Sequence, residues 1–387
     1  MTNIKLGDLC KSCAGQIKVE DGELIDYIDI SSIDNEKKKL IGFQTMPFGE
    51  SPSRARKVVK KGSILVSTVR PNLNAIAVLE NDTPNISVAS TGFCILDCKD
   101  DVDNRFVFNF CKSRKFIDDM VSKATGASYP AVSDKIIRSA LVPNYTYEEQ
   151  CNISKVLDSI SDIIDKREAE LFSLDELIKA RFVELFGFPG TDEKGWGLRR
   201  LGECCEINPK KVSDKRLASG MQVSFVPMTA VSENGAIKTA EKKTYDEVKV
   251  GFTYFAENDV LFAKITPCME NGKGAVAVGL CNGIGFGSTE FHVLRPINGK
   301  SNPYWLYSLI SFDTFRKDAA TNMTGSAGQR RVPSMFLEKY KITLPPFELQ
   351  NQFADFVHQV DKSKVAVQKA LDETQLLFDS LMQQYFE

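Results

Sequence analysis

The sequence predicts an α+β protein in which one globular domain is written twice and each copy is followed by a long helix. Three observations support this prediction. A long apolar stripe without Pro or Gly runs through residues 153–186, and a second stripe follows it about 200 residues later. Short phrases from the first half of the chain return in the same order in the second half. Strand-like and helix-like segments alternate before each stripe.

The first stripe has the spacing of one long amphipathic helix. Its apolar positions recur every three or four residues, at Leu157, Ile160, Ile164, Leu171, Leu174, Ile178 and Leu185. Such a heptad-like seam requires a partner helix. At about 1.5 Å per residue, the helix over residues 153–186 would be about 50 Å long. Arg167 and Arg181 interrupt the seam, and we expect both to lie at its rim with their charged ends in water.

The second stripe supplies the partner helix in the same register. Its apolar seam runs through Val357, Val360, Val367, Leu371, Phe378 and Leu381, and Lys364, Thr374 and Tyr385 complete the pattern. The chain therefore carries both halves of a coiled coil.

The globular parts repeat with an offset that drifts only from about 195 to 202 residues. Lys5-Leu6-Gly7 returns as Arg200-Leu201-Gly202, and Thr125-Gly126 returns as Thr324-Gly325. Residues 62–71, 90–93, 141–143 and 149–150 return as residues 258–267, 288–291, 343–345 and 349–350. This period is too long for a solenoid, so we infer a duplicated domain with pseudo-twofold symmetry. The predicted parts are domains 1–146 and 188–346 and long helices 147–187 and 347–387.

Within each globular part we predict paired elements in chain order. Strands are expected at residues 24–30 and 224–227, 64–69 and 260–265, and 75–79 and 275–278. Helices are expected at residues 106–121 and 304–315, and a last strand precedes each long helix near residues 142–143 and 344–346. Residues 185–196 join the two copies, where Gly187 suits a helix C′ position and Pro189 prevents continuation.

Charge is unevenly distributed along the chain. The total is −2, but the globular parts carry +2 and +5 and the long helices carry −5 and −4. The basic globular parts could therefore attract phosphate, although long helices commonly favour Asp and Glu.

The composition is that of a soluble globular protein. No stretch approaches a membrane span and the first ten residues do not read as a signal peptide, so we expect a cytoplasmic protein with reduced cysteines. Cys10 with Cys13 and Cys94 with Cys98 are lone pairs, and the chain has two histidines. A structural zinc needs four ligands, so we predict no metal and no cofactor of the chain's own.

Several of the repeated phrases, in this order, resemble the specificity subunits of Type I restriction–modification systems. They are the two Leu-Gly openings, residues 62–67 with 258–263, the Thr-Gly loops at 125–126 and 324–331, residues 345–350, and the joint at 185–196. The first copy departs mildly from the family pattern, with Pro143-Asn144-Tyr145 before its helix and Ser128-Tyr129-Pro130 in its loop.

The resemblance implies two target-recognition domains, each reading one half of a bipartite double-stranded DNA site. The two long helices would pack antiparallel, as a spacer and as the docking site of partner subunits. It also implies a non-catalytic specificity subunit. Two modification subunits that carry S-adenosylmethionine would methylate adenine, and restriction/translocase subunits would join for cleavage.

Two other function classes remain as alternatives: a stand-alone DNA adenine methyltransferase or nuclease, and a scaffold protein without a DNA function. Residues 302–305 (Asn-Pro-Tyr-Trp) approach an adenine methyltransferase motif but lack its second Pro. An Asn before a helix is more simply an N-cap with Pro at N1, and we expect Asn104 to serve likewise in the first copy. The Gly-rich residues 272–279 match no phosphate-loop spacing. We predict no catalytic residue.

The candidate DNA-binding residues are polar and basic side chains on loops next to apolar strands. In the first copy they are Arg54, Arg56, Lys57, Lys60, Lys61, Ser67, Thr68, Arg70, Asn72, Asn74, Ser128 and Tyr129. In the second copy they are Lys242, Lys243, Lys264, Thr266, Asn271, Lys273, Gln329, Arg330 and Arg331. Arg, Asn and Gln suit base edges, whereas clustered lysines suit phosphates. The competing interpretation of such runs is ordinary solvated surface.

Overall fold

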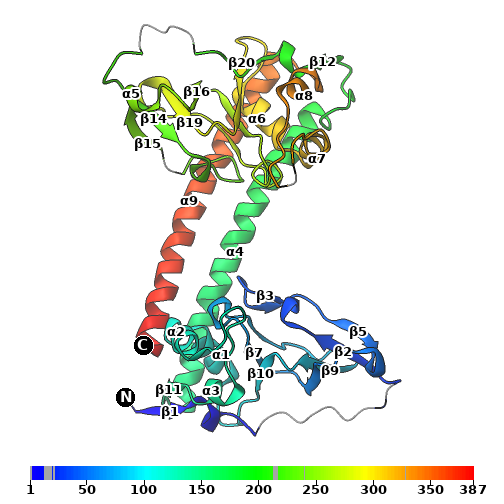
Figure 1. Ribbon diagram of the computed structural model, residues 1–387, viewed down its shortest axis with the longest axis vertical. Coiled ribbons are helices and arrows are strands. Elements are labelled where there is room, and N and C mark those ends of the chain that lie inside the picture. Colours follow the sequence, from blue (N-terminus) through cyan, green and yellow to red (C-terminus); the bar gives the residue numbers. More distant parts are fainter. Residues whose placement is uncertain (1, 13–19, 21, 212–216, 239, 327) are drawn as a thin grey trace. The chain divides into compact units, whose positions relative to one another are not determined.

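A computed structural model describes residues 2–12, 20, 22–211, 217–238, 240–326 and 328–387. The chain forms two compact units, the first made of Met1–Arg167 with Lys369–Glu387 and the second of Glu168–Gln368. Both long helices, α4 (Tyr147–Phe186) and α9 (Phe347–Phe386), contribute to both units (Figure 1). Each unit combines antiparallel and parallel strands with helices, which confirms the predicted α+β class.

Two sheets form the strand part of the first unit. In one, β2 (Leu24–Ile28) runs parallel to β9 (Ile86–Ser90), with β5 (Gln44–Pro47) and β6 (Ala55–Val58) antiparallel at the edges. In the other, β7 (Ile64–Ser67) lies between β8 (Ile76–Val78) and β10 (Phe93–Leu96), antiparallel to both. Short pairs join β1 (Asn3–Lys5) to β11 (Leu141–Pro143) and β3 (Ile33–Asp34) to β4 (Lys39–Leu40).

The second unit repeats these sheets in the same order. One sheet has the order β15 (Glu241–Thr244), β14 (Gln222–Val226), β19 (Ile284–Gly287) and β16 (Thr253–Ala256), and β14 is again parallel to β19. The other has the order β13 (Cys205–Ile207), β20 (Phe291–Pro296), β17 (Val260–Ala263) and β18 (Gly274–Val276). β12 (Leu198–Arg200) pairs with β21 (Lys341–Thr343) as β1 pairs with β11. The shared topology is what a duplicated domain requires.

Each unit also contains short helices, most of which come after the strands of its two larger sheets. They are α1 (Asn104–Lys112), α2 (Arg114–Lys123), α3 (Asp134–Arg138), α5 (Tyr245–Val248), α6 (Pro303–Ser311), α7 (Asp313–Thr321) and α8 (Ser334–Lys339). Single-turn 3-10 helices occupy Leu6–Leu9, Ile30–Ser32, Phe48–Glu50, Pro71–Leu73, Leu201–Glu203, Met228–Ala230 and Cys281–Gly283.

We predicted single helices at residues 106–121 and 304–315, and this prediction was wrong. Each of these segments forms a pair of helices, with the break near residue 113 in the first unit and near residue 312 in the second. Ser113 ends α1 and caps α2, since its hydroxyl accepts a hydrogen bond from the Phe116 N–H at 3.2 Å. A Ser with extended backbone angles stops one helix and starts the next. In the second unit the break lies at Phe312, between α6 and α7.

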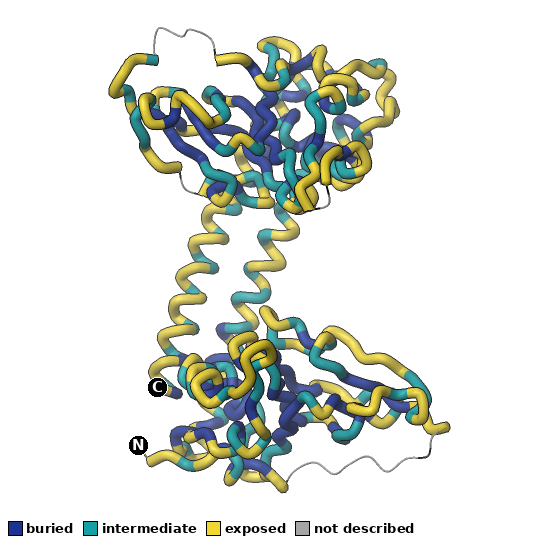
Figure 2. Tube along the Cα trace, in the orientation of Figure 1, coloured by how far each residue is buried: buried dark blue, intermediate teal, exposed yellow. Residues whose placement is uncertain are grey.

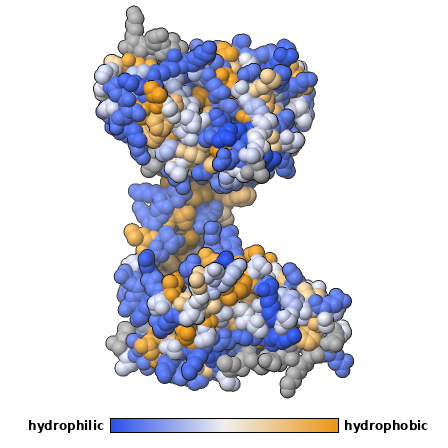
Figure 3. Space-filling view, in the orientation of Figure 1, coloured by the Kyte–Doolittle hydropathy of each residue, from blue (hydrophilic) through white to orange (hydrophobic). Residues whose placement is uncertain are grey.

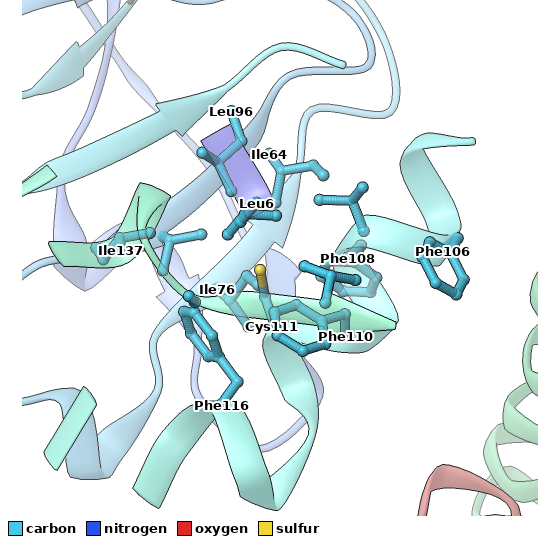
Figure 4. Packing of buried hydrophobic residues seen from close by; sticks show 14 of the residues in the cluster. Leu6, Ile64, Ile76, Leu96, Phe106, Phe108, Phe110, Cys111, Phe116 and Ile137 are labelled. Carbon is cyan, nitrogen blue, oxygen red and sulfur yellow. The ribbon is translucent and has the colours of Figure 1, made fainter. Parts of the chain in front are cut away.

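The first unit has a core made by one sheet, α1 and the end of α9. Figure 4 shows Leu6, Ile64, Ile76 and Leu96 gathered near Phe110 and Cys111 of α1. Phe386, on the last turn of α9, lies with its ring centroid 5.4 Å from that of Phe106 and 5.9 Å from that of Phe110. Burying one such aromatic side chain contributes about 1.5–3 kcal/mol. The end of α9 is therefore part of this core.

The second unit has the corresponding core, in which the end of α4 meets the start of α9. Phe353 of α9 lies 5.5 Å from Phe182 and 5.4 Å from Phe186 of α4, between ring centroids. Trp305 of α6 is buried in the same cluster. In each unit the start of one long helix thus packs on the end of the other, so the pairing within each unit is antiparallel.

Burial along the two helices is uneven. Leu157, Ile160, Val357 and Val360 are buried, whereas the other predicted seam positions are half-buried: Ile164, Leu171, Leu174, Ile178, Leu185, Val367, Leu371, Phe378 and Leu381. Much of each long helix is exposed or half-buried in Figure 2. A seam between only two helices leaves such positions partly open to solvent.

Arg167 is not at the rim of the seam, which corrects our expectation. Its guanidinium donates to the Ala370 carbonyl and to the Thr374 hydroxyl of α9, both in the first unit. Arg181 does match the rim expectation, since it pairs with Glu184 at 2.7 Å on the exposed side of α4. Lys364 of α9 crosses to Asp175 of α4 at 2.6 Å in the second unit. Polar side chains therefore join the helices in both units.

Candidate nucleic-acid interface

In both units a Thr-Gly loop is hydrogen-bonded to the chain that leaves the central strand of a sheet. After β7, the Arg70 N–H donates to the Pro130 carbonyl at 2.7 Å, and the Val132 N–H donates to the Thr68 carbonyl at 2.9 Å. After β17, the Thr266 N–H donates to the Arg330 carbonyl at 3.1 Å, and the Val332 N–H donates to the Lys264 carbonyl at 2.9 Å. We call this arrangement the strand–loop frame: residues 68–70 with 125–132, and residues 264–266 with 324–332.

The two loops close in the same way. Thr125 and Ala131 exchange backbone hydrogen bonds of 3.0 and 2.9 Å, as Thr324 and Arg331 do at 3.0 and 2.8 Å. Gly126 and Gly325 have φ of +104° and +119°. A Cβ atom there would lie only 2.8 Å from the Tyr129 carbonyl oxygen and 2.9 Å from that of Gln329. Only glycine fits this turn, which explains why the Thr-Gly phrase recurs.

In the first unit the frame presents Arg70 and Tyr129 to solvent. The Arg70 guanidinium carbon lies 5.1 Å from the centroid of the Tyr129 ring, and Tyr129 is 69% exposed. Asn72 and Ser128 are also exposed. Among the residues that the structure describes, no acceptor is bonded to the Arg70 guanidinium. Its N–H donors are thus available to a ligand.

Three other candidates of the first unit are turned inward. The Ser67 hydroxyl donates to the Val69 carbonyl and the Thr68 hydroxyl donates to the Gly92 carbonyl, both at 2.9 Å. The buried Asn74 amide donates to the Cys111 carbonyl at 3.2 Å. These bonds hold the loop on the sheet and on α1, so these side chains support the frame.

In the basic run before β7, residues 54–61, some of the side chains are hydrogen-bonded or ion-paired within the protein. Arg54 donates to the Tyr27 hydroxyl at 3.0 Å and pairs with Asp29 at 2.5 Å. Lys57 pairs with Asp134 at 2.7 Å, and Arg56 donates to the Ala55 carbonyl at 2.9 Å. Lys60 and Lys61 are exposed.

In the second unit the frame places carboxylates beside its arginines. Arg331 donates three hydrogen bonds to the Glu290 carboxylate, at 3.2, 2.9 and 2.7 Å, and these bonds lower the pKa of the Glu290 carboxyl. Arg330 reaches Glu270 at 3.3 Å. Gln329 is exposed beside them. The sequence did not single out these two glutamates, although Glu290 replaces Gly92 of the first copy within the repeated Ser-Thr phrase.

The remaining candidates of the second unit differ in exposure. Lys242 and Asn271 are exposed, and Lys264 and Lys273 are half-buried. The Thr266 hydroxyl is buried without a hydrogen-bond partner among the described residues. Lys243 lies 3.8 Å from the centroid of the Phe225 ring and 3.5 Å from Glu241.

The methyltransferase-like phrase is part of a helix cap. The Asn302 side chain accepts from the Tyr304 N–H at 2.9 Å, with Pro303 at N1 of α6, as expected for a cap. In the first unit the cap is Asp103, which accepts from the Phe106 N–H at 2.7 Å, so the expectation for Asn104 was wrong. A carboxylate at residue 103 is the stronger acceptor and takes the position before Asn104.

Each of these two cap residues is hydrogen-bonded to one glutamine that we did not single out in the sequence. The Gln150 side-chain carbonyl accepts from the Asp103 N–H at 3.0 Å, and that of Gln350 accepts from the Asn302 N–H at 2.8 Å. The signal in the sequence was the recurrence of Gln at both positions of the repeat.

No group of three or more His, Cys, Asp or Glu side chains able to hold a metal occurs among the described residues, and Cys13 lies outside them. Burial raises the pKa of Cys94 to about 12, so this thiol stays protonated. No helix in the described part of the chain is both long and apolar enough to cross a membrane.

Residues 193–374 match the family described as the Type I restriction modification DNA specificity domain. The EcoAI specificity subunit of Escherichia coli is 39% identical over 194 residues, and the EcoEI subunit is 38% identical over 196 residues. Each alignment covers 49% of this chain and 32% of the relative, so the chain spans about a third of their length. The MjaIX specificity subunit of Methanocaldococcus jannaschii is 20% identical over 347 residues, covering 84% of this chain and 77% of the relative.

Two solved structures share the fold over the whole chain. One is a chain from a study of complex assembly and conformational transition of the type I R-M system, with a TM-score of 0.57, 22% identity and 97% of that chain covered. The other is the Type I restriction–modification S subunit from M. genitalium, with a TM-score of 0.56, 13% identity and 96% of that chain covered.

Proposed function

We propose that the chain is a specificity subunit of the Type I restriction–modification family and that it recognises a bipartite double-stranded DNA site for such a complex. The observation that supports this most is the duplicated strand–loop frame. Two copies of one pattern of backbone hydrogen bonds, each carrying a different set of polar side chains, suit two different half-sites read by related domains.

We assign target recognition to residues 1–146 and 188–346 and a spacer role to helices 147–187 and 347–387. The proposed base readers are exposed side chains in the frames or next to them: Arg70, Asn72, Ser128, Tyr129, Gln329 and Arg330. Lys60, Lys61, Lys242 and Lys264 are the proposed phosphate contacts, because clustered lysines fix register without reading sequence.

The long helices are the proposed docking surface for partners. They are acidic, yet they expose large apolar side chains, including Phe172 at 67% and Leu376 at 71%. The view in Figure 3 shows hydrophobic residues among hydrophilic ones on the helices. Exposed apolar side chains on a protein surface suit a protein partner. We propose that two modification subunits carrying S-adenosylmethionine dock there and methylate adenine, and that restriction/translocase subunits join them.

The second candidate function, a stand-alone adenine methyltransferase or nuclease, has less support. The side chain of Asn302 is engaged in capping α6 and in donating to the Asn351 amide oxygen at 3.0 Å. A methyltransferase needs its Asn or Asp free to bind the amino group of the substrate base. We therefore propose a subunit without catalytic residues of its own.

Comparison of the methylated DNA of host cells with and without the gene tests the proposal. We expect one bipartite motif with methylated adenine in each half to vanish on deletion and to return on complementation. Purified chain without partners should transfer no methyl group to DNA. Persistence of every modified motif, or methyl transfer by the chain alone, would contradict the proposed function.

A further inference from the structure

The two strand–loop frames share their backbone hydrogen bonds but not their side chains. Arg70 corresponds in position to Thr266. The Arg70 N–H donates to the Pro130 carbonyl, and the Thr266 N–H donates to the Arg330 carbonyl at the matching place of the second loop. Tyr129 likewise occupies the place of Gln329. Two frames that share these backbone hydrogen bonds but present different side chains suit two readers of different sequence.

Arg70 is held more rigidly than an ordinary surface arginine. Its backbone has φ +50° and ψ 63°, in the left-handed region where Gly and Asn are favoured. Its N–H is bonded to the loop, and its guanidinium lies over the Tyr129 ring. Cation–π attraction to an aromatic face restricts the orientation of a guanidinium while leaving its N–H donors free for a ligand.

The surroundings of Arg70 also differ from those of the second-unit arginines. Glu290 accepts three hydrogen bonds from Arg331, and Glu270 accepts one from Arg330. No carboxylate of the described residues pairs with Arg70. An unpaired, oriented guanidinium beside an exposed ring is arranged to meet an acceptor on a ligand.

We propose that Arg70, oriented by the ring of Tyr129, is a specificity-determining residue that reads one guanine in the half-site bound by the first unit. The inference rests on the proposed function. Guanine presents two acceptors, O6 and N7, along its major-groove edge, and the planar arginine fork matches both. A DNA phosphate could also accept from Arg70, but a phosphate contact requires no fixed plane and would distinguish no base.

The test uses the full chain with its modification subunits and the half-site motifs obtained from the host methylome. Binding is measured by competition on four duplexes that differ only at one guanine of one half-site, taking each guanine in turn. The variants are Arg70→Ala, Arg70→Lys, Tyr129→Phe and Tyr129→Leu. Lys99→Ala is the control: it removes one exposed charge after β10, at the end of the sheet opposite to the frame, since Leu96 pairs with Ile64 and Phe93 with Ser67.

We expect Arg70→Ala to reduce the preference for guanine at one position of one half-site by about 5- to 150-fold, the range of one bidentate contact. Arg70→Lys should lose most of this preference while keeping the charge. Tyr129→Phe should keep it, and Tyr129→Leu should reduce it by about 2- to 5-fold, because stacking on the ring is lost. Lys99→Ala should leave base preference unchanged.

Equal weakening on all four bases in Arg70→Ala or Arg70→Lys would identify a phosphate contact and overturn the inference. Unchanged preference at every guanine would overturn it as well, as would Tyr129→Leu behaving like wild type. Thermal melting of each variant beside Lys99→Ala separates misfolding from altered reading, and Arg70→Lys remains the test where Arg70→Ala does not fold. Failure of the proposed function is a different result: deletion of the gene would then leave the methylome intact.

Discussion

Lys112 shows how one half-buried charge makes the stability of the first unit depend on pH. It ends α1 with its ammonium nitrogen 4.7 Å from the centroid of Phe108 and 5.4 Å from that of Phe378 on α9. Burial disfavours the charged form and lowers the pKa of Lys112 to about 8. Because Lys112 lies between α1 and the last turns of α9, the stability of this helix contact depends on whether Lys112 is protonated.

Replacing Lys112 with Met should stabilise the first unit at pH 7 by about 1–3 kcal/mol, because the cost of burying the charge disappears. In the wild type the unfolded state holds this proton more tightly, so the free energy of unfolding should rise as pH increases from about 8 to 10.5. In Lys112→Met that increment should be missing. Scanning calorimetry at pH 7 and pH 10, with exposed Lys135→Met as control, measures both effects. The same response to pH in wild type and Lys112→Met would contradict this account.

At the scale of the elements, each long helix is fastened to its domain by one buried glutamine in its first turn. The Gln150 amide group donates to the Tyr145 carbonyl and that of Gln350 to the Pro345 carbonyl, both at 2.9 Å. The side-chain carbonyl of each accepts from the cap residue of the neighbouring short helix, Asp103 or Asn302. One amide thus satisfies a backbone donor and a backbone acceptor that would otherwise be buried and unpaired.

Gln350→Leu should destabilise the second unit by about 1–3 kcal/mol, because the Asn302 N–H and the Pro345 carbonyl lose their partner without access to water. Urea unfolding followed by tryptophan fluorescence reports on this unit, since both tryptophans, Trp196 and Trp305, belong to it. The matched control is Gln352→Leu, two residues further along α9, where the side chain is exposed. Equal unfolding midpoints for the two variants would show that the glutamine is dispensable.

At the scale of the whole molecule, the two compact units are built from one repeated domain, and both long helices pass through both units. Each unit closes its core with aromatic residues from the last turns of a long helix, Phe386 in the first and Phe186 in the second. The strand–loop frames contain no residue of the long helices. The length of the helices can therefore be changed without changing either frame.

Removing one heptad from each helix, residues 164–170 and 368–374, should shorten the proposed spacer by about 10 Å, or about three base pairs. A seven-residue deletion keeps the helix faces within about 20° of their original direction. We expect the unspecified stretch between the half-sites to shorten while both half-sites stay the same, as read from the methylome of the host. A shorter deletion within the loop at residues 80–85, between β8 and β9, should leave the stretch unchanged. Altered half-sites in the helix variant would argue against the spacer role.

Local patterns were enough to predict the duplication, the long helices and most of the central strands. The heptad spacing of Leu157 and Val357, and the recurrence of Thr-Gly and Gln, are properties of short segments. They could not indicate that β2 pairs in parallel with β9, about 60 residues away, nor how the start of α4 at Tyr147 is capped. At that start, the Thr146 N–H is bonded to Glu149 at 2.8 Å, a cap that apolar periodicity does not detect.

For the candidate site, residue type and position along the chain identified which loops to consider but not which side chains are available. Asn74, Ser67 and Thr68 look like readers in the sequence, yet each has its hydrogen bonds inside the protein. Arg331 meets Glu290, 41 residues earlier in the chain, whereas the partner found for the Arg70 guanidinium among the described residues is the ring of Tyr129. Periodicity and repeats record what neighbouring residues share along the chain, and they set the architecture. The partner of each charged side chain depends on contacts between distant segments, so it exists only once the sheets and loops have come together in space.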